Sequence, residues 1–355
     1  MEKNYLLWLS LVSGVGPKKA ETLLKHFKTA ENIYKASPHE LRKIEGIGDV
    51  FLEKFSEAKK INIEENLEIL HKLNIKFYVK EDEEYPELLK EISDPPLILY
   101  VKGVLPRLPM VGIVGSRIPS SYGAQTALHI SKVLSENGVC VVSGMARGID
   151  TQAHLGALEG NSPTIAILAS GLDICYPSEN KRLYEKIQQN GCLISEHFPG
   201  IRPLEKYFPM RNRIISGLSK AVVVVEAGHM SGSLITVRQA NDQGRDVYAV
   251  PGNINNKLSS GTNNLIRDGA RILTSPVDII EDMNMVFKPL KIEKTKPDLN
   301  IDEQKICDLI SLEELTPEII AERLNDTYQN IQYILTMLEL KGLVERLVGG
   351  RYTAV

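Results

Sequence analysis

Short apolar runs alternate with longer amphipathic segments through the middle of the chain. The runs are rich in β-branched residues and span residues 110–114, 139–142, 164–169, 192–195, 221–225 and 246–250. Runs of this length and composition are typical of parallel strands that are buried on both faces. Because helical segments separate them, the pattern predicts an α/β fold, with an open, doubly wound parallel sheet and helices on both of its faces.

The region before this sheet has a purely helical pattern. In two similar segments an apolar helix is followed by a Gly-hydrophobic-Gly turn and a second helix, at Gly14-Val-Gly and at Gly46-Ile-Gly. This is the helix-hairpin-helix pattern, whose exposed amides can hold a phosphate without reading bases. Lys18 and Lys19 follow the first turn and favour such a contact, whereas Asp49 follows the second and opposes it. A purely structural helical module is the alternative.

The end of the chain is predicted to form a winged helix. Helical stretches at residues 303–312, 317–324 and 328–341 are followed by two short strands about Gly349-Gly350. Three helices followed by a small hairpin make a winged-helix arrangement. The last of these helices carries few cations, so a transcription factor that reads duplex DNA is only a weak alternative.

Changes of composition mark the boundaries between these regions. We predict a helix-hairpin-helix (SAM-like) domain at residues 1–65, an α/β domain at 66–284, a linker at 285–300 and a winged-helix domain at 301–355. The acidic run that begins at Glu81 is predicted to be a solvated face.

The net charge, the lengths of the apolar runs and the cysteine content exclude several classes of protein. The 355 residues carry a net charge of −3, so any nucleic-acid binding must come from a local patch. There is no run of about 18 apolar residues, and the apolar N-terminal stretch continues into a helical pattern; we predict neither a membrane span nor a signal peptide. The 4 cysteines are scattered without a C-x-x-C motif, which favours reduced thiols in the cytoplasm over a zinc site.

The strongest chemical signal lies in the loops after the first two strands of the sheet. The first strand ends in Gly115-Ser116-Arg117, and the second in Ser143-Gly144 with Arg147 close behind. Glycine permits a sharp turn, the next helix directs its free N–H groups at the loop, and arginine matches phosphate. Two such strand ends side by side predict an anion-binding crevice at the carboxyl edge of the sheet. The alternative is a pair of ordinary turns, and no dinucleotide or Walker A motif indicates a NAD or ATP site.

More cations and several aromatic residues fall in neighbouring loops. The cations are Lys181, Arg182, Arg211 and Arg213, and the aromatic residues are Tyr176, Tyr207 and Phe208. If these loops share one edge of the sheet, they form a basic patch on a domain that is otherwise nearly neutral. Aromatic rings beside cations predict a preference for single-stranded nucleic acid with little preference among bases, although core packing is the expected role of at least one of the three.

Catalytic groups are harder to identify than binding groups. Glu226, at the end of the most apolar strand, is the best single acid, although it could equally cap the following helix or pair with one of the arginines. His154 lies inside a predicted helix and is interpreted as a hydrogen-bonded structural residue. No metal-ligand spacing or nucleophile motif is present, so we predict no cofactor and no metal.

An ordered set of motifs carries a resemblance to a known family. The motifs are Gly115-Ser-Arg, Ser143-Gly-x-Ala-x-Gly-Ile-Asp, Tyr176-Pro-x-x-Asn180, Phe208-Pro-x-Arg-Asn-Arg213, Ser231-Gly-Ser-Leu-Ile-Thr and Val250-Pro-Gly252. Together they resemble the DNA-processing protein A family (DprA, also called Smf). The helix-hairpin-helix and winged-helix regions agree with one domain layout of that family.

The resemblance implies an extended Rossmann-like domain that binds single-stranded DNA and has no established enzymatic activity. It also implies a homodimer that protects incoming DNA and loads the recombinase RecA during natural transformation. The expected DNA-binding residues are Gly115, Ser116, Arg117, Ser143, Gly144, Arg147, Lys181, Arg211, Asn212, Arg213, Gly232 and Ser233. The dimer and RecA surfaces are expected near residues 229–238 and after Pro251. The helix that carries Leu234, Ile235 and Val237 is the candidate dimer patch, with packing against the sheet as its alternative.

An enzyme on the same scaffold is the competing function. Phosphoribohydrolases that split nucleoside monophosphates resemble this fold and carry Pro-Gly-Gly-x-Gly-Thr, with a glutamate two residues on. The corresponding stretch here begins at Glu226 and reads Glu-Ala-Gly-His-Met-Ser-Gly-Ser. Because it lacks both the glycine run and the downstream glutamate, the sequence favours binding over hydrolysis.

Overall fold

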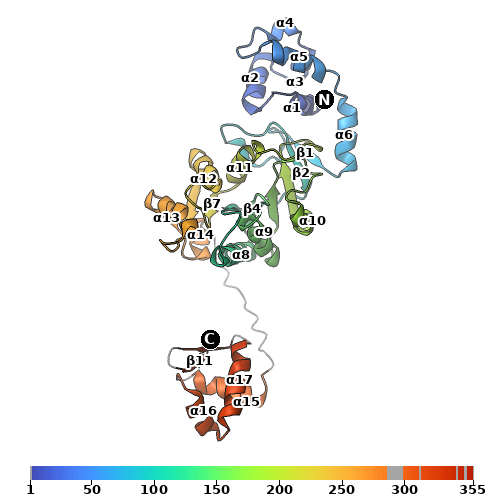
Figure 1. The fold of residues 1–355 in the computed structure, drawn as a ribbon. Helices are drawn as coiled ribbons and strands as arrows, with labels where there is room; N and C mark the ends of the chain where they lie inside the picture. The colour runs from blue at the N-terminus through green and yellow to red at the C-terminus, as the bar shows by residue number, and fades with distance from the viewer. Residues whose placement is uncertain (1, 286–298, 312, 341–342, 348–349, 355) are drawn as a thin grey trace. The chain divides into compact units, whose positions relative to one another are not determined.

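The structure, a computed structural model, describes residues 2–285, 299–311, 313–340, 343–347 and 350–354. The chain divides into two units, residues 1–289 and 290–355, which are drawn in Figure 1. The predicted linker lies almost entirely outside the described residues. The predicted boundary near residue 65 falls inside the first unit.

A nine-stranded sheet forms the centre of the first unit, in the order β1-β2-β6-β5-β4-β3-β7-β8-β9. Its strands are β1 (Lys76–Tyr78), β2 (Leu99–Gly103), β3 (Met110–Val114), β4 (Cys140–Ser143), β5 (Thr164–Ile167), β6 (Gly191–Ser195), β7 (Ala221–Val224), β8 (Asp246–Ala249) and β9 (Arg271–Ile272). The strands from β3 to β9 pair in parallel, which confirms the predicted fold class. Two antiparallel strands, β2 and β1, extend the sheet beyond β6.

Helices cover both faces of the sheet, because successive side chains of a strand point to opposite faces. Ile165 and Ile167 lie in the same hydrophobic cluster as Ile214. Ala166, between them, packs on the other side with Leu183. The helices of this region are α8 (Ser121–Glu136), α9 (Ile149–Glu159), α10 (Lys181–Gln189), α11 (Tyr207–Leu218), α12 (Ser233–Asp242), α13 (Ser260–Arg267) and α14 (Pro276–Asp282).

The N-terminal helices form the tandem hairpins that the sequence predicts. They are α1 (Glu2–Leu11), α2 (Pro17–Phe27), α3 (Ala30–Lys35), α4 (Pro38–Leu41), α5 (Asp49–Ala58), α6 (Ile63–Lys72) and, in the connector, α7 (Glu87–Lys90). Gly14 and Gly46 have φ values of 88° and 80°, a left-handed conformation that favours glycine. The Trp8 indole donates a hydrogen bond of 2.8 Å to the carbonyl of Ala58 and ties α1 to the end of α5.

The junction between these helices and the sheet uses both apolar and charged contacts. Leu6 and Leu7 of α1 share a hydrophobic cluster with Tyr100 of β2. Lys3 of α1 forms an ion pair of 2.7 Å with Asp82. The acidic run at residues 81–84 is therefore exposed except for Asp82, whose ion pair joins the helical region to the connector.

The second unit has the predicted winged-helix arrangement. Its elements are α15 (Ile301–Ile310), α16 (Pro317–Leu324), α17 (Tyr328–Leu340) and the antiparallel pair β10 (Val344–Arg346) and β11 (Tyr352–Ala354). Ile306, Ile331 and Tyr352 contribute to one core. Residues 312, 341 and 349, where predicted helix ends and the hairpin turn fall, lie outside the described residues. Among the described helices, none has the length and apolar content that a membrane crossing requires.

Candidate nucleic-acid interface

The crevice lies where the order of the strands reverses. β3 pairs with β4 on one side and with β7 on the other, so the loops that follow β3 and β7 diverge and leave space between them. Small-ligand sites typically have volumes of about 300–1,000 Å³, and the cavity here measures about 680 Å³. Its lining includes the predicted residues Gly115, Ser116, Arg117, Arg211, Asn212, Gly232 and Ser233. The structure thus brings together three loops that are far apart in the sequence.

The start of α8, the first helix after β3, is already occupied by a carboxylate. The buried Glu226 side chain accepts hydrogen bonds from the Ser120 amide at 2.9 Å and from the Ser120 hydroxyl at 2.5 Å. A Cβ at Gly123 would lie 2.3 Å from this carboxylate, so the close approach requires glycine. Ser120 itself caps α8, because its hydroxyl accepts a hydrogen bond of 3.1 Å from the Gly123 amide. The expectation that this helix offers free amides to an anion is therefore corrected, and Glu226 holds the capping residue Ser120 instead of capping the helix that follows β7.

The start of α9, after β4, also carries its own carboxylate. Asp150 accepts a hydrogen bond of 3.3 Å from the Ala146 amide. Burial raises the pKa of Asp150, while the nearby Arg211 guanidinium opposes that rise. This helix start is therefore no better placed than that of α8 to receive a phosphate.

The start of α12, after β7, differs from both of these. Gly232 caps the helix without a side-chain hydrogen bond, and the first turn contains no acidic residue. The hydroxyl groups of Ser231 and Ser233 lie 2.8 Å apart beside it. The Ser231 hydroxyl accepts a hydrogen bond of 3.4 Å from the Ser233 amide, so the turn satisfies that donor itself. Because this helix start faces the cavity with two hydroxyls and without a carboxylate, it is the best of the three for an anion.

Two aromatic rings and an arginine form a row along one wall of the cavity, which we call the stacking row. The guanidinium of Arg117 lies 5.4 Å from the centre of the Phe208 ring. The Tyr176 ring lies 5.7 Å from Phe208, at an angle of 53° between the ring planes. Arg117 and Tyr176 are exposed, and no ion pair of Arg117 occurs within the described part of the chain. A flat base can stack on such rings while the cation contacts the backbone.

Arg211 lines the cavity, but its guanidinium is committed to the protein. It is buried, and one of its nitrogens donates to the carbonyls of Gly144 and Ile167 at the ends of β4 and β5. Its Nε donates to the Oδ1 atom of Asn212 at 3.2 Å. Burial lowers the pKa of Arg211 to about 10. Arg211 therefore fixes the loops around the cavity and orients Asn212.

Arg213 and Ser143 do not line the cavity. Arg213 is buried and forms ion pairs with Glu196 and, at 3.2 Å, with Asp94. The buried Ser143 hydroxyl donates to the carbonyl of Ile113 at 2.6 Å. A phosphate could reach Arg213 only by breaking buried ion pairs, so the geometry gives this residue a structural role.

Lys181 and Arg147 lie outside the main cavity. Lys181 is exposed at the start of α10. Arg147 lines a smaller recess with Arg117, Gly144, Tyr176 and Phe208, on the other side of the stacking row. Arg147 is paired with Glu179, a contact that the sequence pattern did not predict.

Three further predictions can be compared with the structure. His154 is buried and shares a hydrogen bond of 2.8 Å between its Nδ1 and the Thr164 hydroxyl, which confirms the structural interpretation. Tyr207 does not join the stacking row, because its ring lies 4.2 Å from His197. Leu234 and Val237 of the candidate dimer helix pack into the core of the sheet, and Ile235 lines the cavity. These residues of α12 therefore pack against the sheet, which was the alternative to the predicted dimer patch.

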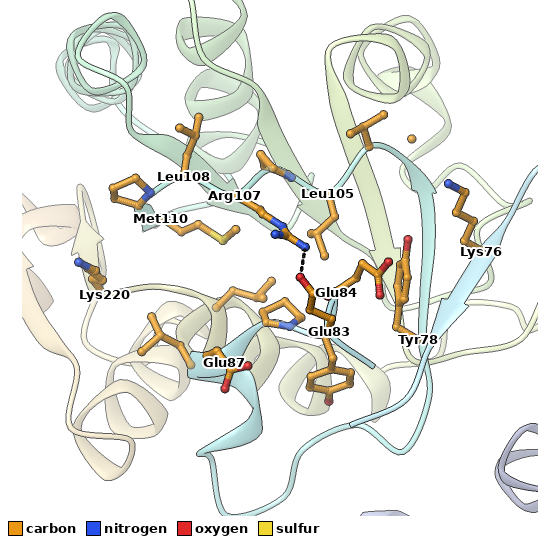
Figure 2. A pocket seen from close by; sticks show the side chains of 18 residues that line it. Lys76, Tyr78, Glu83, Glu84, Glu87, Leu105, Arg107, Leu108, Met110 and Lys220 are labelled. Atoms are coloured by element: carbon orange, nitrogen blue, oxygen red, sulfur yellow. Dashed lines mark hydrogen bonds and ion pairs between the residues drawn. The ribbon is translucent and has the colours of Figure 1, made fainter. Parts of the chain in front are cut away.

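A second cavity, of about 580 Å³, opens near the amino ends of the strands (Figure 2). An ion pair of 3.1 Å between Arg107 and Glu83 crosses it. The charged groups of its lining have both signs: Lys76, Arg107 and Lys220 face Glu83, Glu84 and Glu87. A polyanion gains little from a mixed rim of this kind. The cavity at the carboxyl edge also has charges of both signs, but it adds an exposed arginine beside two aromatic rings and is therefore the better nucleic-acid site.

Three family models match successive parts of the chain. The model for DNA recombination-mediator protein A matches residues 76–284. A SAM-like helix-hairpin-helix tandem matches residues 8–50, and a DprA winged-helix domain matches residues 292–350.

Several known proteins are similar over most of the same region. Protein Smf of Synechocystis is 40% identical over 292 residues, which is 80% of this chain and 73% of that protein. The DNA processing protein DprA of Streptococcus pneumoniae is 46% identical over 203 residues, 57% of this chain and 72% of that protein. An X-ray structure of DprA from Streptococcus pneumoniae has a TM-score of 0.68 at 37% identity and covers 79% of this chain and 97% of that chain. A structure described for the unique single-stranded DNA binding mode of DNA processing protein A from Helicobacter pylori has a TM-score of 0.54 at 30% identity. It covers 59% of this chain and 96% of that chain.

Proposed function

Because the chain belongs to the DNA recombination-mediator protein A family, we propose that it binds single-stranded DNA in the crevice between the β3 and β7 loops. The observation that carries the proposal is the stacking row of Tyr176, Phe208 and Arg117 beside the start of α12, whose first turn contains no acidic residue. Unstacked bases of a single strand can reach such rings, whereas the bases of a duplex cannot. The single-stranded DNA binding described for the Helicobacter pylori relative supports the same assignment.

The proposed contacts divide into two kinds. Phosphates contact Arg117, Lys181 and the start of α12 at Gly232 and Ser233, because the first two are positive and the helix start presents hydroxyls without a carboxylate. Bases contact Phe208 and Tyr176, with the Asn212 amide close by. Gly115 leaves room for Ile149 and Gly144 for the Arg211 guanidinium, because a Cβ at either position would lie within 2.7 Å of those side chains. Arg211 in turn holds the loops in place. Contacts of this kind read the backbone and the base faces, so little base preference results.

A competition assay with a single aromatic substitution tests this proposal. We expect an oligothymidine to displace a labelled single strand far better than a duplex of equal length does. Phe208→Ala should weaken single-strand binding by about 1–3 kcal/mol, because one base loses its stacking partner. Tyr207→Ala is the matched control, since its ring lies against His197 and outside the row. Equal displacement by the duplex, or equal effects of the two substitutions, would count against the crevice.

We propose that the protein acts by binding and not by catalysis. The carboxylate that a hydrolase on this scaffold would use is missing from the loop after β7, and the Glu226 carboxylate is committed to the amide and hydroxyl of Ser120. Work on DNA would then come from a partner that uses ATP. The proposed partner is the recombinase RecA, which must assemble on strands that other proteins cover.

Two highly exposed apolar residues favour a protein interface beside the crevice. Met230 is 97% exposed and Ile254 is 89% exposed, and they lie in the loops that follow β7 and β8. Both fall in the regions where the dimer and RecA surfaces are expected. We therefore propose that the homodimer or RecA covers these loops, and that the α12 helix itself does not form the patch.

The RecA proposal predicts a kinetic effect. This protein should shorten the lag before a cognate RecA hydrolyses ATP on single strands coated with single-strand-binding protein. The physical reason is that the proposed homodimer carries two copies of the crevice. Once one copy holds the strand, the second copy is tethered to it and meets the strand at a high effective concentration. A coupled ATPase time course with and without the protein measures the lag. An unchanged lag across a range of stoichiometries would reject RecA loading while leaving DNA binding intact.

A further inference from the structure

One of the three exposed cations among the expected DNA-binding residues is already neutralised within the described residues. Arg117 and Lys181 have no ion pair there, whereas Arg147 holds Glu179 through two nitrogens. The second of these contacts joins Arg147 Nη2 and Glu179 Oε2 at 3.1 Å. Both side chains are about half exposed, at 56% and 51%. A planar guanidinium that holds a carboxylate through two nitrogens is a fork that also fits a phosphate.

The two loops that carry this pair are held together without it. The buried Asn180 side chain donates to the carbonyl of Met145 and to the hydroxyl of Thr151, both at 3.0 Å. These contacts tie the turn at residues 178–180 to the loop and helix on either side of Arg147. The Glu179 carboxylate can therefore leave Arg147 without any movement of the backbone.

The carboxylate lies beside the surface that a strand would follow. Arg147 shares its recess with Arg117, Tyr176 and Phe208, so it continues the stacking row toward α10. Lys181, two residues after Glu179, begins that helix. A strand that passes from Arg117 to Lys181 would bring a phosphate to the fork that Glu179 fills.

We propose that Glu179 is an internal competitor for DNA phosphate, whose carboxylate occupies Arg147 in the free protein and is displaced when the strand binds. The inference rests on the proposed function of the crevice. An exposed ion pair contributes little to stability, so its displacement is easy but not free. The result is a site that binds DNA less tightly than its cations alone would allow. A moderate affinity suits a protein that transfers its strand to a partner.

A double-mutant cycle tests this role. Glu179→Gln keeps the size of the side chain and removes its charge, and it should tighten binding of a labelled oligothymidine by roughly twofold to fivefold at low salt. In the Arg147→Ala background the same change should give no gain, because the competitor then has nothing to occupy. Fluorescence anisotropy of wild type, both single variants and the double variant measures the coupling.

Glu159→Gln is the matched control for a lost surface charge. Glu159 is also exposed and paired, with Lys132 at 3.3 Å, but it lies at the far end of α9. Its substitution should leave the affinity unchanged. Weaker or unchanged binding by Glu179→Gln, or a gain that persists without Arg147, would overturn the competitor role while wild-type binding stands. No single-strand binding by the wild-type protein would overturn the proposed function as well.

Discussion

Charge reversal at Arg117 or at Lys181 is expected to nearly abolish the binding of single-stranded DNA while the fold remains intact. Each side chain is exposed and has no ion pair within the described residues, so neither holds the structure together. Glutamate at either position removes a cation from the path of the strand and adds an anion that repels phosphate. A loss of roughly a hundredfold in affinity at low salt is expected.

The salt dependence of binding separates this site from general electrostatics. Each lost phosphate contact should reduce the log–log slope of affinity against salt by about 0.7. Lys220→Glu is the control, because Lys220 is an exposed cation that lines the cavity at the opposite ends of the strands (Figure 2). Normal circular dichroism with unchanged affinity in both charge-reversed variants would refute the site. A similar loss for Lys220→Glu would show that net charge alone determines binding.

Arg213→Ala is expected to lower the free energy of unfolding of the first unit by about 3–5 kcal/mol. The substitution leaves Glu196 buried without its cation and removes the partner of Asp94 as well. Breaking a buried pair from one side is costly because the remaining charge loses solvation and gains nothing in return. Urea unfolding followed by circular dichroism measures the change.

Arg107→Ala provides the comparison for this second substitution. Its ion pair with Glu83 is exposed, with side-chain exposures of 75% and 83%, so its loss should cost less than about 1 kcal/mol. The folded fraction of Arg213→Ala should bind DNA with nearly the affinity of wild type. Unchanged stability together with lost DNA binding would return Arg213 to the list of DNA contacts.

Local pattern was sufficient to predict most of the sheet and part of the site. The apolar runs at β3 and β7 match the observed strands because buried parallel strands carry a composition of their own. The convergence of Arg117 and Ser233 follows from the rule that loops at the carboxyl ends of neighbouring strands meet. β1 was missed because a strand of 3 residues at the edge of a sheet has no apolar run to mark it.

The remaining assignments depend on partners that are distant in sequence. Arg211 and Arg213 stand in one short motif, yet their positions on α11 are about 200° apart around the helix axis. Arg211 therefore faces the cavity, whereas Arg213 meets Asp94 and Glu196, which come from other elements. The sequence alone could not decide whether Glu226 caps a helix, acts as an acid or forms an ion pair with an arginine. That choice depended on Ser120, which lies 106 residues away.

The contact between Ser120 and Glu226 at the start of α8 also has a consequence for biosynthesis. Ser120 is made long before Glu226, and β3 gains its neighbour β7 only after more than half of the chain has been synthesised. Domains generally fold as units, so the sheet is complete only after β7 and the strands that follow it have left the ribosome, and until then one flank of β3 has no neighbour. The crevice cannot exist at that stage, since α12 and the loop after β7 form its second wall. A nascent chain on the ribosome therefore has no finished DNA site, and the ability to bind a strand arises only when the last third of the sheet is in place.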